Sequence, residues 1–330
     1  MTQVALIAVH GMGETLPDYA DGLMAGLRSR LDALASQVVM RSVYYQGILH
    51  DNQRMVWDRT SATGQVRYAA LRKFVLYGLG DAAGLENSKD DPGSIYEQAQ
   101  GEIATTLLSA YAARPGMPVV FVAHSLGCQV LSSYLYDAQK AAAGKPVGAG
   151  IWRDIGAWAG ATLGRSLTAS ELAFIGGGTC VALVTTGCNI PIFVAAHQEM
   201  HIIPIAPPTS LFKWINFYDP DDVLGWPLQP LSNGYRELVE AYGRWTSRQV
   251  GKDEALKIYE AFDKVLPQHP LILEAMSEIK DGEKLPPLVE SPQAGAAEVL
   301  FGLGTSLGRQ GGEDLALAYL QLAIYLAPRH

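Results

Sequence analysis

The sequence has few basic residues and few cysteines, and both shortages narrow the classes of protein to consider. Lysine and arginine number 25 against 33 acidic residues, which gives a formal net charge of −8, and the 330 residues contain no dense basic cluster. Because neutralising phosphates requires a basic surface, this balance argues against a nucleic-acid partner. The three cysteines, Cys128, Cys180 and Cys188, are an odd count in a long chain, so we expect no disulfide framework and a reducing, cytoplasmic location.

Long apolar runs that direct export or cross a membrane are also missing. The apolar run at 4–9 is too short for the core of a signal peptide, and no positive charge precedes it. Residues 172–196 carry no charge and are long enough to cross a bilayer, but turn-forming residues at 176–178, 185–187 and 189–191 would break a lipid-exposed helix. We therefore expect no membrane span, and favour a buried strand followed by a loop.

Short apolar runs alternate with longer helical stretches over most of the chain. The runs are rich in valine, isoleucine and aromatic residues, and their continuous apolarity is typical of strands that are covered on both faces. The alternation predicts an α/β fold with a doubly wound, mostly parallel sheet up to about residue 235. The expected strands are 4–9, 38–45, 118–122, 180–185 and 214–218, and the main expected helices are 19–36, 94–113 and 128–142.

Two inserts interrupt this alternation, at about 48–93 and 143–179. Inserts of this length after sheet strands often form lids or pocket walls, and they also occur as plain surface elaborations. Their composition does not identify a substrate.

Residues 236–330 are predicted to be all-helical and to contain a repeat. The most regular unit spans about 297–330, and the spacing resembles the tetratricopeptide repeat, although an ordinary amphipathic helical hairpin is the alternative. Helix 314–326 is apolar on most of its circumference, so we expect this region to bind a protein partner or to mediate self-association. The residues at matching offsets are Ala255, Tyr259, Phe262 and Pro267, then Ala316, Leu320, Ala323 and Pro328.

The strongest chemical signal is a serine at the end of the third expected strand. The apolar run 119–122 leads into Ala123, His124, Ser125, Leu126 and Gly127, with a small residue two places to either side of the serine. A nucleophile in a strand-to-helix turn has strained backbone angles and needs small neighbours, so that its Oγ stands exposed at the sheet edge. The pattern predicts Ser125 as a nucleophile, and a helix-capping serine is the alternative.

A glycine-containing loop, His10-Gly11-Met12-Gly13, follows the first expected strand. In hydrolases with such a serine turn, a loop here supplies one backbone N–H to the oxyanion, and the residue after the nucleophile supplies the other. We therefore predict the N–H groups of Met12 and Leu126 as the oxyanion hole. A phosphate-binding turn is the alternative, but the loop lacks both the lysine of a P-loop and the third glycine of a dinucleotide-binding motif.

An acid that orients a catalytic base is expected in the turn after a later strand. The apolar run 214–218 is followed by three carboxylates, Asp219, Asp221 and Asp222. A solvated turn that caps a helix would show the same pattern. All three carboxylates are candidates on this pattern alone.

Residues 1–235 resemble the α/β-hydrolase superfamily, in particular bacterial hydrolases of the lipase and esterase type. The resemblance implies a serine hydrolase that cleaves a small-molecule ester or related acyl substrate, with no cofactor and no metal. The segments that carry it are the loop 10–13, the Ser125 turn, 187–191 and 219–228.

The resemblance also selects an acid and leaves the base open. Several lipase-like relatives carry the acid four residues after the aromatic residue that ends the strand, which here selects Asp222, with Asp221 second and Asp219 third. Relatives carry the histidine base shortly after the acid, but no histidine lies between His201 and His269 in this sequence.

His269 is the candidate base that we name after the acid, but its Pro-Gln-His-Pro context is typical of an exposed turn, so we expect it to lie too far from Ser125 Oγ to act. His10 and His124 flank Ser125, and we expect their side chains to point away from its Oγ. Two hypotheses follow. The chain is either a serine hydrolase or a catalytically impaired hydrolase fold that acts, with its helical repeats, as a protein-interaction module.

Overall fold

The computed structural model describes residues 3–243 except 63, 65–68, 197–201, 220, 221 and 223, and isolated helical positions farther along the chain. The chain divides into two compact units, Met1–Gly243 and Arg244–His330. The helical repeat predicted at 236–330 falls mainly on residues that are not described, so it stays a prediction, as does its binding role.

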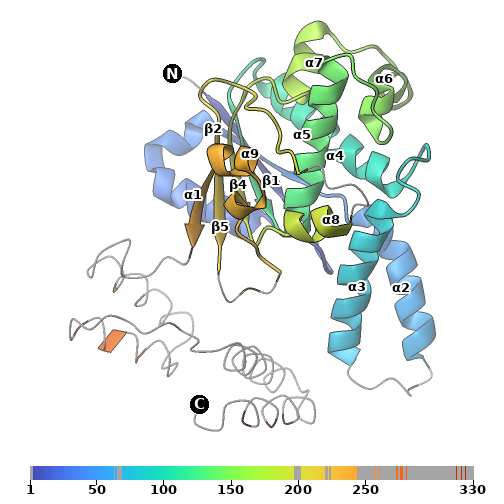
Figure 1. Cartoon of the computed structure of the whole chain (residues 1–330), viewed down its shortest axis with the longest axis vertical. Helices are drawn as coiled ribbons and strands as arrows, with labels where there is room; N and C mark the ends of the chain where they lie inside the picture. The colour runs from blue at the N-terminus through green and yellow to red at the C-terminus, as the bar shows by residue number, and fades with distance from the viewer. Residues whose placement is uncertain are drawn as a thin grey trace. The chain divides into compact units, whose positions relative to one another are not determined.

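A six-stranded parallel sheet forms the centre of the first unit (Figure 1). The strand order is β2-β1-β3-β4-β5-β6, and every neighbouring pair is parallel. This confirms the predicted α/β architecture, whereas assignment to the α/β-hydrolase superfamily stays a prediction. The strands are β1 (Val4–Val9), β2 (Val38–Val43), β3 (Val119–His124), β4 (Cys180–Thr186), β5 (Lys213–Tyr218) and β6 (Val239–Gly243).

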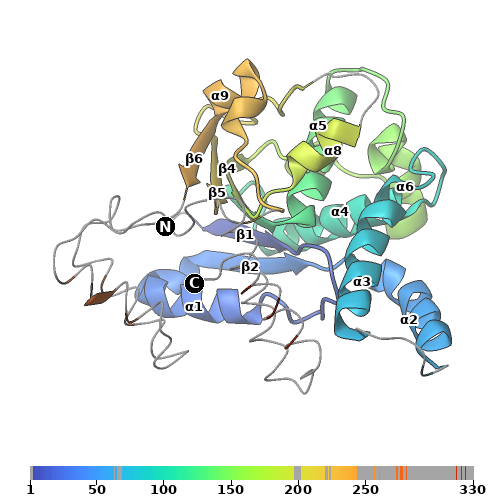
Figure 2. The same cartoon turned by 60° about the horizontal axis from the view of Figure 1, so that its bottom comes forward.

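Helices cover both faces of this sheet (Figure 2). Helices α4 and α5 pack on one face through the main apolar core, and α1 packs on the other face over β1 and β2. The helices are α1 (Asp21–Leu31), η1 (Asp32–Gln37), α2 (Gly47–Ser61), α3 (Ala69–Glu86), α4 (Ile95–Ala113), α5 (Leu126–Ala142), η2 (Ile151–Arg153), α6 (Ile155–Leu163), α7 (Ala169–Ile175), α8 (Ile190–Ala196), η3 (Gln229–Leu231) and α9 (Asn233–Leu238).

Both inserts are largely helical. The insert at 48–93 forms a hairpin of α2 and α3 that starts soon after β2 and extends away from the sheet (Figure 1). The insert at 143–179 forms η2, α6 and α7, of which η2 contacts both α4 and α5.

Strand β6 corrects our expectation that no strand follows residue 235. It pairs with β5 at the edge of the sheet, from the pair Trp214 and Val239 to the pair Tyr218 and Gly243. An edge strand pairs on one side only and tolerates exposed charge such as Glu240, so it lacks the continuous apolar run by which we identified strands.

The uncharged segment 172–196 does not form a single helix. It contains the end of α7, the buried strand β4 and helix α8, in agreement with the strand that we favoured. Among the described helices, none combines the length and apolarity needed to cross a membrane.

Candidate active site

Ser125 stands in the sharp turn between β3 and α5. Its backbone angles are φ 50° and ψ −122°, a conformation that residues other than glycine rarely adopt. Its N–H donates to the carbonyl of Thr186 at 2.9 Å, and its own carbonyl accepts the N–H of Cys128 at 2.9 Å, which ties the turn to β4 and to α5. The Ser125 hydroxyl does not cap α5, so the capping alternative has no hydrogen bond to support it.

Two glycines let the loop at 10–13 lie directly against this turn. A Cβ on Gly11 would stand 2.8 Å from Ser125 Cβ. A Cβ on Gly127 would collide with the backbone carbonyl oxygen of His10. Because these neighbours belong to the nucleophile turn and to the end of β1, neither glycine can gain a side chain without displacing the site.

The N–H groups predicted to bind an oxyanion are those of Met12, in the loop at 10–13, and of Leu126, in the turn that the loop contacts. Leu126 is the first residue of α5, where an N–H has no acceptor within its own helix. Met12 follows Gly11 in the loop. Over the described part of the chain, no protein acceptor is hydrogen-bonded to either N–H, so both can bind a developing negative charge.

His10 holds the loop and has no nitrogen left to act as a base. Its Nδ1 is 2.8 Å from the carbonyl oxygen of Gly11, and its Nε2 accepts the N–H of Tyr45 at 3.2 Å. The Tyr45 ring stacks on the imidazole at 4.1 Å, and its hydroxyl donates to the His10 carbonyl at 3.0 Å. Burial lowers the pKa of His10 to about 4, so the imidazole is neutral and its Nδ1–H donates to Gly11.

The carboxylate segment after β5 brings Asp222 to the same sheet edge. A Cβ on Gly187, in the turn after β4, would stand 3.3 Å from Asp222 Oδ2 and 3.4 Å from His124 Nε2. The N–H of Asp222 donates to the Asp219 carbonyl at 3.1 Å, and its Oδ1 accepts the N–H two residues later at 2.9 Å. Asp219 is exposed after β5, and Asp221 lies outside the described residues.

The His124 side chain borders two glycines that pack around the site. A Cβ added to Gly11 would stand 3.0 Å from His124 Nδ1 as well as 2.8 Å from Ser125 Cβ. A Cβ added to Gly187 would stand 3.4 Å from His124 Nε2 and 3.3 Å from Asp222 Oδ2. His124 keeps part of its surface in solvent; its partial desolvation lowers the pKa of the imidazole, and the negative charge of Asp222 acts in the opposite direction. The imidazole therefore borders both Gly11, which packs against the nucleophile turn, and Gly187, which packs against the candidate acid.

No base is joined to Ser125 Oγ by a hydrogen bond among the residues that the structure describes. His269, the base named from the sequence, lies outside them, so its role stays a prediction. Of the described histidines, His10 has both nitrogens engaged and His50 packs edge-on against Tyr77 at 5.8 Å in the α2–α3 hairpin. His124 is left as the described histidine beside the candidate nucleophile.

Sequence reasoning missed three residues that support the loop at 10–13. Asp81 of α3 is 1% exposed and accepts the N–H of Gly13 at 2.9 Å. Gln46 and Gln53 donate side-chain N–H groups to the same carboxylate. The one signal in the sequence is that Asp81 stands as a single acid among small and apolar residues, at 78–85.

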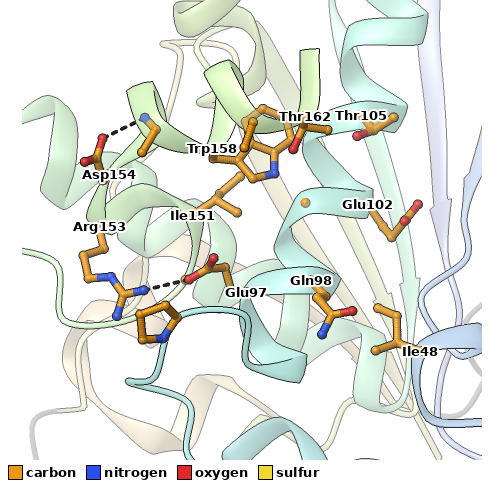
Figure 3. Close-up of a pocket in the computed structure, with 15 residues that line it drawn as sticks. Ile48, Glu97, Gln98, Glu102, Thr105, Ile151, Arg153, Asp154, Trp158 and Thr162 are labelled. Atoms are coloured by element: carbon orange, nitrogen blue, oxygen red, sulfur yellow. Dashed lines mark hydrogen bonds and ion pairs between the residues drawn. The ribbon is translucent and has the colours of Figure 1, made fainter. Parts of the chain in front are cut away.

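A cavity of about 510 Å³ lies elsewhere, between α4, η2 and α6 (Figure 3). Glu102 lines it on the α4 side and Trp158 on the α6 side. Its other charges already have partners: Arg153 pairs with Glu97 at 2.8 Å, and Asp154 caps the start of α6. No residue of the Ser125 site lines this cavity.

Comparison with models of known protein families finds no match to this chain, and comparison with curated proteins finds no significantly similar sequence.

Proposed function

We propose that this chain is a serine hydrolase that cleaves an ester or related acyl bond, with Ser125 as the nucleophile. The strained turn at Ser125, packed by Gly11 and Gly127 against a loop with unengaged N–H groups, carries the proposal. The strained backbone at Ser125 costs free energy, and a protein that only binds partners would gain nothing chemical from it.

The chemistry follows from the positions of these groups. Ser125 Oγ attacks the carbonyl carbon, a base takes its proton, and the N–H groups of Met12 and Leu126 stabilise the oxyanion. The leaving alcohol departs with that proton, and water then hydrolyses the acyl-enzyme in the same way. Asp222 orients the base and stabilises its charged form. None of these steps uses a cofactor.

A catalytically impaired fold that acts as an interaction module is the second candidate. It is favoured by the finding that, within the described residues, no base is hydrogen-bonded to Ser125. The two functions differ in the reactivity of the serine hydroxyl, because an unactivated serine does not react with fluorophosphonates.

Labelling with a fluorophosphonate probe, followed by peptide mapping, tests the proposal. We expect one adduct, on Ser125, which forms when the probe is added to the folded protein and does not form when the protein is denatured before the probe is added. A folded protein that incorporates no probe, and that does not hydrolyse short p-nitrophenyl esters, would leave the interaction module as the function.

Replacing Asp222 should slow hydrolysis more than replacing its neighbour Asp221. Asp222→Asn is expected to lower kcat by at least about tenfold, because only a carboxylate stabilises the protonated base. Asp221→Asn is the matched control and should stay near the parent rate. A larger loss in Asp221→Asn would move the role to that residue.

The base is tested by replacing His124 and His269 separately. We expect His124→Ala to lower kcat by roughly 10²-fold or more and His269→Ala to leave it unchanged, because a general base contributes about 10²–10⁴-fold. The reverse result would assign the role to His269.

The pH profile gives an independent test of His124. A base acts in its neutral form, and burial holds the pKa of His124 below its usual value of 6.5. The rate should therefore stay constant down to about pH 6.5 and fall only below it. An acidic limb centred above neutral pH would exclude His124.

A further inference from the structure

The α2–α3 hairpin touches the predicted oxyanion loop at two consecutive residues. Helix α3 carries Gly78, and a Cβ there would stand 3.2 Å from the sulfur of Met12. One turn along the same helix, Asp81 accepts the N–H of Gly13 at 2.9 Å. The insert therefore contacts the loop through a side chain and through the backbone.

Asp81 is an unusual group to find in this position. It is 1% exposed, and in the described structure no lysine or arginine forms an ion pair with it. Its other hydrogen bonds come from neutral amides: Gln46 Nε2 lies 2.8 and 3.0 Å from its two oxygens, and Gln53 Nε2 lies 2.5 Å from Oδ1. Burial raises the pKa of Asp81, and these donors oppose the rise. A buried carboxylate is costly unless hydrogen bonds compensate for its lost hydration, and here neutral donors do so.

The hydrogen bonds around the loop determine which way the Met12 N–H points. The carbonyl of Gly11 and the N–H of Met12 belong to one trans peptide, so they point in opposite directions. His10 donates to that carbonyl at 2.8 Å, which directs the Met12 N–H away from the His10 ring. The next peptide is held by the bond from Gly13 to Asp81.

Without that second anchor, the hydrogen bond left at Gly13 among the described residues is the long one from the Thr15 hydroxyl to its carbonyl, at 3.3 Å. Gly13 has φ +106°, and a Cβ placed on it would meet no atom within 4 Å, so packing does not restrain it. A change in the backbone angles of Gly13 would rotate the two peptide groups on either side of Met12. The Met12 N–H would then turn away from the oxyanion. An oxyanion hole is effective because its donors are oriented before the reaction.

We propose that Asp81 is a positioning residue that keeps the Met12 N–H oriented for the oxyanion, with Gln46 and Gln53 holding its carboxylate in place. The inference rests on the proposed function, since it assigns a task within the Ser125 site. It makes the α2–α3 insert part of the site's support rather than a surface elaboration.

Asp81→Asn tests this assignment, with Asp137→Asn as the matched control. Asp137 is also a carboxylate held by neutral donors, Tyr96 at 2.7 Å and Gln100 at 2.9 Å, but it contacts no residue of the loop. For p-nitrophenyl acetate we expect Asp81→Asn to lower kcat about 10- to 100-fold with KM changed less than about twofold. Asp137→Asn should retain the parent kcat.

Two further readouts separate positioning from general loss of structure. An arylboronic acid forms a tetrahedral adduct on the serine, so its Ki should rise by the same factor as kcat/KM falls. Amide hydrogen exchange at Gly13 should accelerate in Asp81→Asn and stay unchanged in Asp137→Asn. If Asp81→Asn does not fold, Gln46→Met removes both hydrogen bonds that Gln46 Nε2 donates and should give a smaller change in the same direction.

The outcomes distinguish this inference from the proposed function. A labelled, active parent whose kcat is unchanged in Asp81→Asn, or equally lowered in Asp137→Asn, overturns the role of Asp81 alone. A parent that is neither labelled at Ser125 nor active overturns the proposed function and the role of Asp81 with it.

Discussion

Replacing Ser125 by alanine is expected to abolish fluorophosphonate labelling and to lower ester hydrolysis by about 10³-fold or more. No other hydroxyl of the described residues stands in a strained turn against a loop with unengaged N–H groups. The fold should survive, because the Ser125 hydroxyl makes no capping hydrogen bond to α5. Thermal unfolding, with rates on p-nitrophenyl acetate, measures both effects.

Ser94→Ala is the matched control for this variant. Ser94 also precedes a helix, but it has ordinary backbone angles and its hydroxyl accepts the N–H of Glu97 at 3.2 Å. Removing such a cap costs about 1 kcal/mol of stability, so this variant should melt earlier and keep its activity. A Ser125→Ala variant that loses stability and keeps its rate would show that Ser125 is a helix cap.

The strands that lead into the candidate site were predictable because they are buried on both faces. Ile7, Phe121 and Leu183 have no exposed surface, and this burial requires the continuous apolar runs that identified β1, β3 and β4. Neighbouring parallel strands end at the same sheet edge, so the residues that follow them meet there. The edge strand β6 was missed because it needs no such run.

The support around the site could not be predicted in the same way. Asp81 lies 68 residues from Gly13 in the sequence, and the hydrogen bond between them follows from how the α2–α3 hairpin packs. The surroundings of the His124 side chain were not predicted either. Its environment is made by Gly11 and Gly187, two glycines whose own sequence positions indicate nothing about an imidazole.

Gly127→Ala is expected to destabilise the fold and to reduce activity together. The added Cβ would collide with the carbonyl oxygen of His10 and stand 2.9 Å from that of Val9, which are backbone atoms at the start of the loop and at the end of β1. Overpacking costs about 1–3 kcal/mol, and here the relief must come from moving β1 or α5. Either movement separates the Met12 N–H from Leu126, and a misplacement of about 1 Å can cost roughly 10²-fold in rate.

Gly22→Ala provides the control, since Gly22 is also the second residue of its helix. A Cβ there would meet no atom within 4 Å, so the substitution should be neutral or stabilise the protein by up to about 1 kcal/mol, with unchanged kcat. Chemical denaturation and initial rates on the same preparations measure the pair. Equal behaviour of the two variants would mean that β1 and α5 are not in close backbone contact at Gly127. A destabilised Gly127→Ala protein with full kcat would show that the close contact at Gly127 stabilises the fold but is not needed to orient the oxyanion donors.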